Sequence, residues 1–223
     1  MWRMPKIDKL FTERMEDVLE LYERPHNQEE PVVCLDEKSK QLLEDARTRL
    51  PAKPGKTACR DYQYRRGGTR NLFIAVEPKG GYREVAVTKR RQKRDFARVI
   101  KELVEKTYQK AKQIHIVLDN LNTHFASSLQ ETFGKRITKQ LLKRIVFHYT
   151  PCHASWLNMA EIEISVLSKQ CIKGRIGTEA QLKEYASAWQ ENRNKQKAKI
   201  NWRFTRKKAR RVFKYRLKNI HKI

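Results

Sequence analysis

The sequence lacks the signals of several common protein classes. No apolar run approaches the roughly 18 residues of a membrane span, and residues 1–6 lack the apolar core of a signal peptide. The four cysteines form no Cys-x-x-Cys pair, so we expect neither a disulfide framework nor a zinc knuckle, but reduced cytoplasmic thiols. A glycine-rich phosphate loop, a nucleophile elbow and a kinase signature are also missing.

Acidic residues are scarce relative to basic ones. The 223 residues include 50 Lys and Arg but only 25 Asp and Glu, a net charge of +25. Such an excess predicts a polyanionic partner. The apolar fraction of 39% is lean but sufficient for one large domain.

Basic residues gather in two stretches that we predict to contact DNA phosphates. They are Lys89, Arg90, Arg91, Lys93 and Arg94 in the first stretch, and Arg203, Arg206, Lys207, Lys208, Arg210 and Arg211 in the second. A solvated surface is the alternative for the first stretch. The second could also be an ordinary helix that packs Trp202, Phe204 and Phe213 inward, and both interpretations can hold at once.

Apolar periodicity and turn residues predict the order of elements. Strands are expected at residues 32–36, 69–76, 82–87, 114–119 and 144–148, and helices at 93–112, 127–133, 139–142, 161–171 and 178–194, with a brief helix at 40–50. This order predicts an α/β fold whose mixed five-stranded sheet is flanked by helices. We divide the chain into an N-terminal helix and linker (1–30), a catalytic domain (31–200) and a basic C-terminal tail (201–223).

Three acidic residues stand where predicted strands end or a helix begins. Asp36 and Asp119 each end an apolar run, and Glu161 lies in a helix's first turn. Each has an ordinary structural alternative, because Asp caps helices and Glu favours the first helical turn. Together, at the rims of adjacent elements, they suit a site for hard divalent cations such as Mg²⁺, which take oxygen ligands.

Other polar residues near these positions are open to two interpretations. His124 is either a core or turn histidine or a group near a reacting phosphate. Glu163 lies two residues beyond Glu161 and points elsewhere on a helix, which favours a solvated or structural acid. Glu37 faces away from the preceding aspartate if the strand continues.

Three sequence blocks resemble the catalytic blocks of DDE transposases. Residues 33–37 resemble the first block, residues 118–120 with His124 the second, and residues 155–161 (Ser-Trp-Leu-Asn-Met-Ala-Glu) the third. Over residues 24–215 the chain resembles the bacterial insertion sequence 630 family of the mariner superfamily. The Leu-Asn-x-x-Glu register of the third block selects Glu161 over Glu163.

The resemblance implies a ribonuclease H-like fold in which Asp36, Asp119 and Glu161 are the catalytic and metal-binding residues. Asn120, His124 and Asn158 would lie near this site. It implies two Mg²⁺ (or Mn²⁺) ions, cleavage of double-stranded DNA, and transfer of the freed 3′-hydroxyl to a TA target. It also implies a homodimer on DNA, in a bacterial cytoplasm and associated with the nucleoid.

Full-length relatives carry an N-terminal helix-turn-helix region, for which residues 1–30 offer only one helix. We therefore expect a catalytic domain alone, with a possible separate N-terminal DNA-binding chain and no membrane partner. Two alternatives are a catalytically idle DNA-binding remnant and a ribonuclease H-type nuclease that cuts RNA–DNA hybrids. The intact acidic triad argues against the first, and the Ser-Trp-Leu-Asn block against the second.

Overall fold

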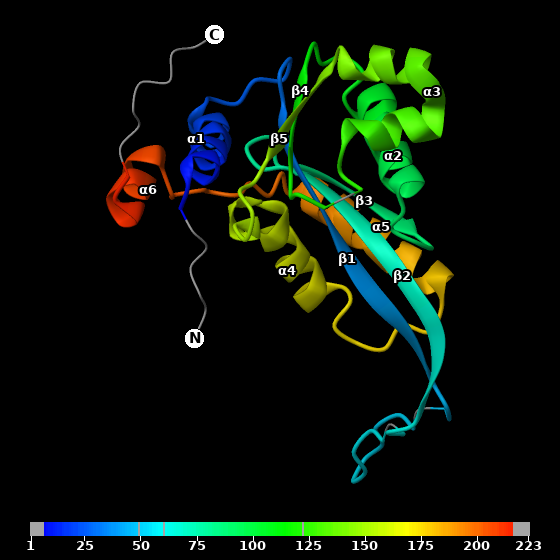
Figure 1. The fold of residues 1–223 in the computed structure, drawn as a ribbon. Coiled ribbons are helices and arrows are strands. Elements are labelled where there is room, and N and C mark those ends of the chain that lie inside the picture. Colours follow the sequence, from blue (N-terminus) through cyan, green and yellow to red (C-terminus); the bar gives the residue numbers. More distant parts are fainter. Residues whose placement is uncertain (1–6, 49, 60, 122, 216–223) are drawn as a thin grey trace.

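A five-stranded sheet of order β3-β2-β1-β4-β5 forms the centre of the computed structural model (Figure 1). The structure describes residues 7–48, 50–59, 61–121 and 123–215, so the outermost parts of the predicted N-terminal segment and tail, 1–6 and 216–223, lie outside the described residues. The strands are β1 (Val32–Asp45), β2 (Tyr64–Glu77), β3 (Tyr82–Thr88), β4 (Ile114–Leu118) and β5 (Ile145–Tyr149).

The strand directions bring two of the predicted acids to one edge of the sheet. β1, β2 and β3 pair antiparallel, whereas β4 pairs parallel with both β1 and β5. Cys34 pairs with Val117, so Asp36 and Asp119, each two residues further on, reach the same edge. The predicted mixed five-stranded sheet is thus confirmed.

Helices cover both faces of this sheet (Figure 1). One face carries α2 (Lys93–Glu102), continued by a π-helical turn at Leu103–Thr107, and α3 (Ala126–Leu142). The other face carries α4 (Ala160–Gln170) and α5 (Glu179–Lys195) over β1 to β3. On the same side, α1 (Lys9–Glu23) packs against β5, and α6 (Arg206–Phe213) packs against α1.

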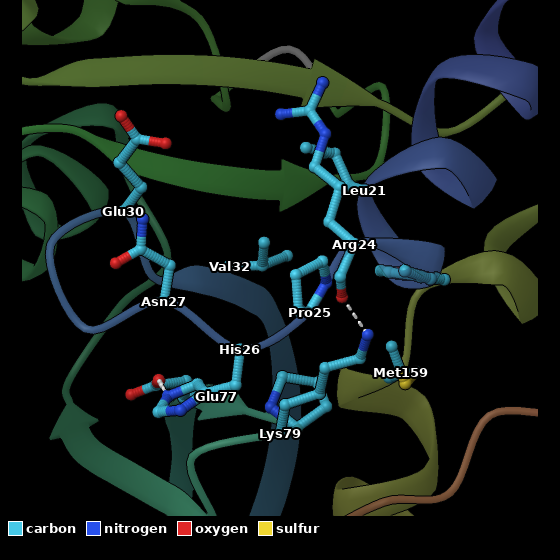
Figure 2. A pocket seen from close by; sticks show the side chains of 12 residues that line it. Leu21, Arg24, Pro25, His26, Asn27, Glu30, Val32, Glu77, Lys79 and Met159 are labelled. Atoms are coloured by element: carbon cyan, nitrogen blue, oxygen red, sulfur yellow. Dashed lines mark hydrogen bonds and ion pairs between the residues drawn. The ribbon is translucent and has the colours of Figure 1, made fainter.

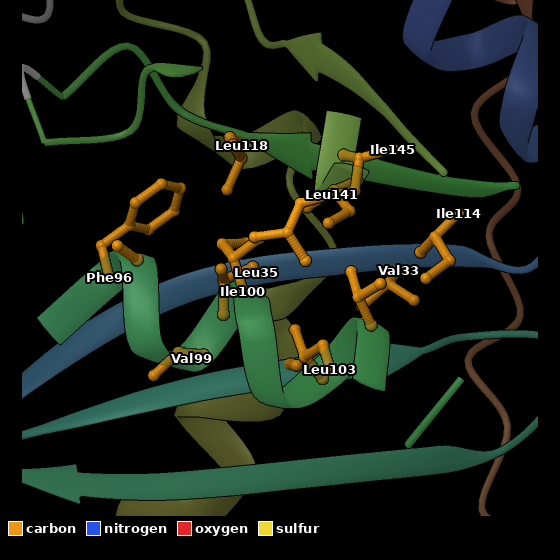
Figure 3. Packing of buried hydrophobic residues seen from close by; sticks show 14 of the residues in the cluster. Val33, Leu35, Phe96, Val99, Ile100, Leu103, Ile114, Leu118, Leu141 and Ile145 are labelled. Carbon is orange, nitrogen blue, oxygen red and sulfur yellow. The ribbon is translucent and has the colours of Figure 1, made fainter. Parts of the chain in front are cut away.

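The alternation of side chains along β1 sets up the core and the site. Val33 and Leu35 pack against Phe96 and Ile100 of α2 (Figure 3), while Cys34 faces the cluster that contains α1 and α6. Because side chains alternate along a strand, Asp36 follows Cys34 and Glu37 follows Leu35. The two adjacent acids therefore serve opposite faces of the sheet.

Several predicted element bounds are wrong. Residues 40–48 do not form a helix, because β1 continues to Asp45 paired with β2, across an irregularity between Gln41 and Leu43, and buries Leu42 beneath α4 and α5. β2 starts at Tyr64, five residues before its predicted start. The two helices predicted at 127–133 and 139–142 are both present as parts of α3, separated at Gly134, where φ is 76°, but the second begins several residues before 139.

The long β1–β2 ribbon projects beyond the body of the molecule, with residues 46–63 at its tip (Figure 1). Arg175 holds the chain where this tip joins the strands: it forms an ion pair with Asp45 at 2.8 Å and donates hydrogen bonds to the backbone oxygens of Asp61, Tyr62 and Gln63. Among the described residues, none of the helices has both the length and the apolar character needed to cross a membrane.

Candidate active site

Asp36 lies at the sheet edge where β1 passes the end of β4, and it is only 9% exposed. Burial raises the pKa of Asp36 to about 7, although a hydrogen bond from Glu37 N at 2.7 Å lowers it. The negative charges of Asp119, Glu161 and Glu37 add smaller increases. The three acids predicted from sequence thus share one electrostatic environment.

His124 connects Asp119 to Glu37. Its Nδ1 lies 2.6 Å from Asp119 Oδ1 and its Nε2 lies 2.8 Å from Glu37 Oε1. Both neighbours are carboxylates, which accept hydrogen bonds, so the imidazole donates from both nitrogens and is positively charged. Burial lowers the pKa of His124, but the hydrogen bonds to Asp119 and Glu37 raise it to about 9 overall.

The surroundings hold this imidazole in place. His124 is fully buried, and the Phe96 ring lies against it with centroids 4.9 Å apart. Tyr149 donates a hydrogen bond to the His124 carbonyl at 2.9 Å. The second oxygen of Glu37, Oε2, is buried and has no hydrogen-bond partner among the described residues.

Glu37 was missed as a site residue by sequence reasoning, although the signal was available. It does face away from Asp36, as predicted. Yet the alternation that places Val33 and Leu35 in the core continues to Glu37, so a buried carboxylate could have been expected there. A buried carboxylate requires a charged or hydrogen-bonding partner, and His124 is that partner.

Asn158 ties the start of α4 to the strand that carries Asp36. The side chain of Asn158 is fully buried; its Nδ2 donates to the Leu35 carbonyl at 2.9 Å and its Oδ1 accepts from Ala160 N at 3.1 Å. In the 3-10 turn that precedes it, Ser155–Leu157, the Leu157 carbonyl accepts a 2.8 Å hydrogen bond from the Tyr22 hydroxyl. Glu161 follows three residues after Asn158.

Asn120 lies beside Asp119 on the same loop. Its side chain donates to the Thr150 carbonyl and accepts from Arg14 Nη1 at 2.5 Å. These contacts link the end of β4 to α1 and to the residue after β5. Asn120 thus holds the loop that carries Asp119, whereas Asn158 holds the start of α4, the helix that carries Glu161.

The two glutamates of α4 have opposite environments. Glu161 is exposed, whereas Glu163 is fully buried, with Arg83 Nε and Arg193 Nη2 at 2.8 and 3.0 Å from its Oε1. Glu163 is therefore a structural acid and not a solvated one. Its side chain is committed to two arginines on the side of the helix away from Asp36.

The carboxylates of Asp36, Asp119 and Glu161 approach one another but do not form a closed cage. Within the described part of the chain, no group of three or more His, Cys, Asp and Glu side chains is close enough to hold a metal ion. The donors are nevertheless those that hard divalent cations prefer. The raised pKa of Asp36 also reflects negative charge that a cation would balance, so the residues present fit a divalent metal.

Part of the first basic stretch lines a groove next to this site. Lys89, Arg90, Arg91 and Arg94 are exposed, whereas Lys93 forms an ion pair with Glu131 at 2.7 Å. Arg91, Lys93, Arg94, Arg98 and Thr123 line one groove. Arg98, which sequence reasoning missed, thus joins the basic stretch, and the groove reaches the residue that precedes His124.

The second basic stretch divides into paired and exposed residues. Arg206 forms ion pairs with Glu20 and Glu23, and Arg210 with Glu16, at 2.7 to 3.2 Å. These contacts and the packing of Trp156 against Phe204 and Phe213 fix α6. Arg210 is exposed despite this pairing, and so are the four remaining residues of the stretch: Arg203, Lys207, Lys208 and Arg211.

Residues 31–183 match the family model described as DDE superfamily endonuclease. The chain belongs to this family. The matched segment contains Asp36, Asp119 and Glu161. No curated protein matches the chain.

Solved structures similar to this DDE superfamily endonuclease include complexes of the Mos1 mariner transposase. The Mos1 mariner paired end complex with Mn is 16% identical with a TM-score of 0.55, over 86% of this chain and 58% of that chain. A pre-cleavage Mos1 transpososome is 15% identical with a TM-score of 0.48, over 89% of this chain and 64% of that chain. The first likeness shows a shared ribonuclease H-like fold. This chain spans less than two thirds of either transposase chain.

A separate pocket lies where β1 begins, and Asp36, Asp119 and Glu161 are not among the residues that line it (Figure 2). The linker after α1 meets the β2–β3 turn there. His26 Nε2 lies 2.7 Å from Glu77 Oε1, and Lys79 donates to the Arg24 carbonyl. These contacts fasten the linker to the sheet, which is a sufficient structural reason for the polar residues in this pocket.

Proposed function

We propose that this chain is the catalytic domain of a transposase of the insertion sequence 630 branch of the mariner superfamily. It would cleave DNA strands with divalent metal and join the freed 3′ end to target DNA. The observation that carries the proposal is the approach of Asp119 and Glu161 to Asp36, close enough to raise the pKa of its carboxyl group. Family membership and the ribonuclease H-like fold support it.

Asp36, Asp119 and Glu161 would hold two divalent cations, Mg²⁺ or Mn²⁺. When bound, such ions lower the pKa of an attacking water and stabilise the charge that develops on the leaving 3′ oxygen. Asp36 must lose its proton to serve as a ligand. Cationic His124 donates a hydrogen bond to Asp119 and so fixes the direction of its carboxylate. Because Glu161 is exposed, a change of its side-chain rotamer suffices to turn its carboxylate toward the aspartates.

The basic groove of Arg91, Lys93, Arg94 and Arg98 would receive the phosphates that flank the cut. It reaches Thr123, so DNA lying in it would pass the loop that carries Asp119 and His124. Such charges contact backbone phosphates and read little sequence. We propose that the protein acts as a homodimer on bacterial nucleoid DNA, with end recognition supplied by a separate N-terminal DNA-binding chain or segment.

A nicking assay tests this function against its alternatives. The protein is incubated with supercoiled duplex DNA and with an RNA–DNA hybrid, in Mg²⁺, in Mn²⁺ and in excess chelator. The proposal predicts metal-dependent nicking of the duplex. Cutting of the hybrid alone would identify a ribonuclease H-type nuclease. Tight DNA binding with no cleavage in any metal would identify an idle remnant.

A further inference from the structure

A buried cluster of two arginines and one glutamate lies on the side of α4 opposite to the candidate active site. Arg83 of β3 and Glu163 of α4 have no exposed side-chain surface, and Arg83 Nε lies 2.8 Å from Glu163 Oε1. Arg193 of α5 donates from Nε and Nη2 to the two oxygens of Glu163 at 3.1 and 3.3 Å, and its side chain is 19% exposed. One glutamate of α4 thus joins two other elements.

Arg83 also binds the chain segments around it. Arg83 Nη1 donates to the carbonyls of Gly81 and Arg193, and its Nη2 donates to the Ala198 carbonyl at 2.6 Å. The side chain of Asn194 pairs with both the N–H and the C=O of Arg83 at 2.8 Å. The cluster therefore fixes β3, the end of α5 and the segment after it as one frame against which Glu163 is held.

Stability alone is a poor reason for this cluster. A buried ion pair seldom stabilises a fold more than well-packed apolar residues of the same volume would, because both charges lose their hydration. The hydrogen bonds and ion pairs of this cluster are directional, whereas apolar packing is not. Arg193 donates to both oxygens of Glu163, and Arg83 forms an ion pair with one of them. These contacts fix where Glu163 points, and hence the rotation of the helix that carries it.

Glu163 is well placed to control Glu161 in this way. Successive residues of an α-helix are turned by about 100°, so residues two apart project about 200° apart, to nearly opposite sides. Glu163 points into the arginine frame, which leaves Glu161 on the side of the sheet edge. Asn158 holds the start of the same helix to β1 through Leu35. The helix is thus fixed at two points, one before Glu161 and one after it.

We propose that Glu163 is a positioning residue that, through Arg83 and Arg193, sets the rotation of α4 and so aims the carboxylate of Glu161 at the metal site. This inference rests on the proposed function, in which Glu161 is a metal ligand. Glu163 touches neither substrate nor metal. Its loss would act through the position of Glu161, and the first property affected would be the affinity for metal.

The test replaces the buried pair with apolar residues that keep the fold. In the double variant Arg83→Met/Glu163→Leu, both buried charges are removed, and Arg193 can turn its side chain to solvent. Binding of Mn²⁺ is measured by titration calorimetry, and folding by circular dichroism and thermal melting. We expect a folded protein whose Mn²⁺ dissociation constant rises roughly 10- to 100-fold, the usual effect of losing a residue that orients a metal ligand.

A matched control removes another ion pair on the sheet that does not contact α4. Arg70 of β2 lies 2.5 Å from Glu179 of α5, and Arg70→Gln/Glu179→Gln should leave the dissociation constant within about twofold of the unchanged protein. A second variant, Arg193→Lys, keeps the charge but replaces the two-point contact with a single one. It should weaken Mn²⁺ binding roughly three- to tenfold, and it decides the matter if the double variant does not fold.

The possible failures can be told apart. Saturable Mn²⁺ binding by the unchanged protein that is lost in Glu161→Ala supports the metal site itself, and its absence would overturn the proposed function together with this inference. If the unchanged protein binds Mn²⁺ but a folded Arg83→Met/Glu163→Leu protein, or Arg193→Lys, binds it equally well, the positioning role of Glu163 is overturned and the proposed function stands. A comparable loss of Mn²⁺ affinity in the Arg70→Gln/Glu179→Gln control would also overturn the positioning role of Glu163.

Discussion

His124 Nε2 lies 2.8 Å from Glu37 Oε1, across 87 residues of sequence. Through this contact β1 contributes to the site from both of its faces. Asp36 faces α4 and Glu161, and the adjacent Glu37 reaches Asp119 through the imidazole. One strand therefore interacts with both other acids of the candidate site, with Glu161 through the charge of Asp36 and with Asp119 through Glu37 and His124.

The charged state of His124 makes stability depend on pH. Its pKa in the folded protein is about 9, against an ordinary value of 6.5. A raised pKa means that the folded state holds a proton that the unfolded state has released between these values. The contribution of His124 to the free energy of unfolding is therefore complete below pH 6.5 and is lost as pH rises through 9. It amounts to about 3 kcal/mol.

We expect His124→Asn to lower the free energy of unfolding most at pH 6 and least above pH 9. Urea titrations of both proteins at pH 6, 7.5 and 9.5, in chelator, measure this difference. The titration of Asp36 is common to both proteins and largely cancels. A difference that stays constant across this range would show that folding does not raise the pKa of His124.

The affinity for metal should also change with pH, because of Asp36. The pKa of this carboxyl group is about 7, so below pH 7 a cation must displace its proton. We expect the Mn²⁺ affinity to rise nearly tenfold per pH unit between pH 5.5 and 6.5 and to level off above pH 7.5. Calorimetry across this range measures it. A flat profile would remove Asp36 from the ligands.

Replacing any one of the three acids should abolish cleavage. Residues that share one metal site act as a unit, so Asp36→Ala, Asp119→Ala and Glu161→Ala should each reduce nicking at least about a thousandfold while the affinity for DNA holds. Glu105→Ala, an exposed acid in the helical turn after α2, is the control. Cleavage near the original rate in any of the three would exclude that residue from the site.

The division of the tail predicts two kinds of variant. Each of Lys207, Lys208 and Arg211 that contacts a phosphate should contribute about 0.9 to the slope of log affinity against log salt. Lys207→Gln/Lys208→Gln/Arg211→Gln should therefore flatten this slope by up to about 2.7 without changing the melting temperature.

Arg206→Gln/Arg210→Gln should lower stability and leave the salt dependence of DNA binding nearly unchanged, because both arginines are held by acids of α1. We expect a small loss of stability, up to about 1 kcal/mol for each partly exposed pair, and little change in slope. Filter binding at several salt concentrations and thermal melting separate the two sets. Equal slope changes in both would mean that α6 leaves α1 when DNA binds.

The sequence predicted the sheet because its apolar runs carry a local signal. The runs at 114–118 and 32–36 form strands wherever both faces are buried, and the turn residues between runs mark their ends. The segment 40–50 was misjudged for the opposite reason. Leu42 and Leu43 lie within a helix-like pattern, and only pairing with β2, a distant partner, makes the segment a strand.

The residues of the site that carry a local sequence signal were predictable, and its long-range contacts were not. Asp36, Asp119 and Glu161 follow recognisable runs and a recognisable block. The contacts between Glu37 and His124 and between Glu163 and Arg83 span 87 and 80 residues. Such pairs depend on how the elements pack, which local periodicity does not encode. Burial of Glu37 was the one part that alternation along the strand already implied.

The position of bound metal tests the central claim most directly. Crystals of the unchanged protein are soaked in Mn²⁺, and anomalous scattering is measured near the manganese absorption edge. We predict two peaks between the carboxylates of Asp36, Asp119 and Glu161, with the Glu161 side chain turned toward the aspartates and the backbone of α4 unmoved. Strong peaks elsewhere, or none at this edge of the sheet at saturating Mn²⁺, would contradict the account.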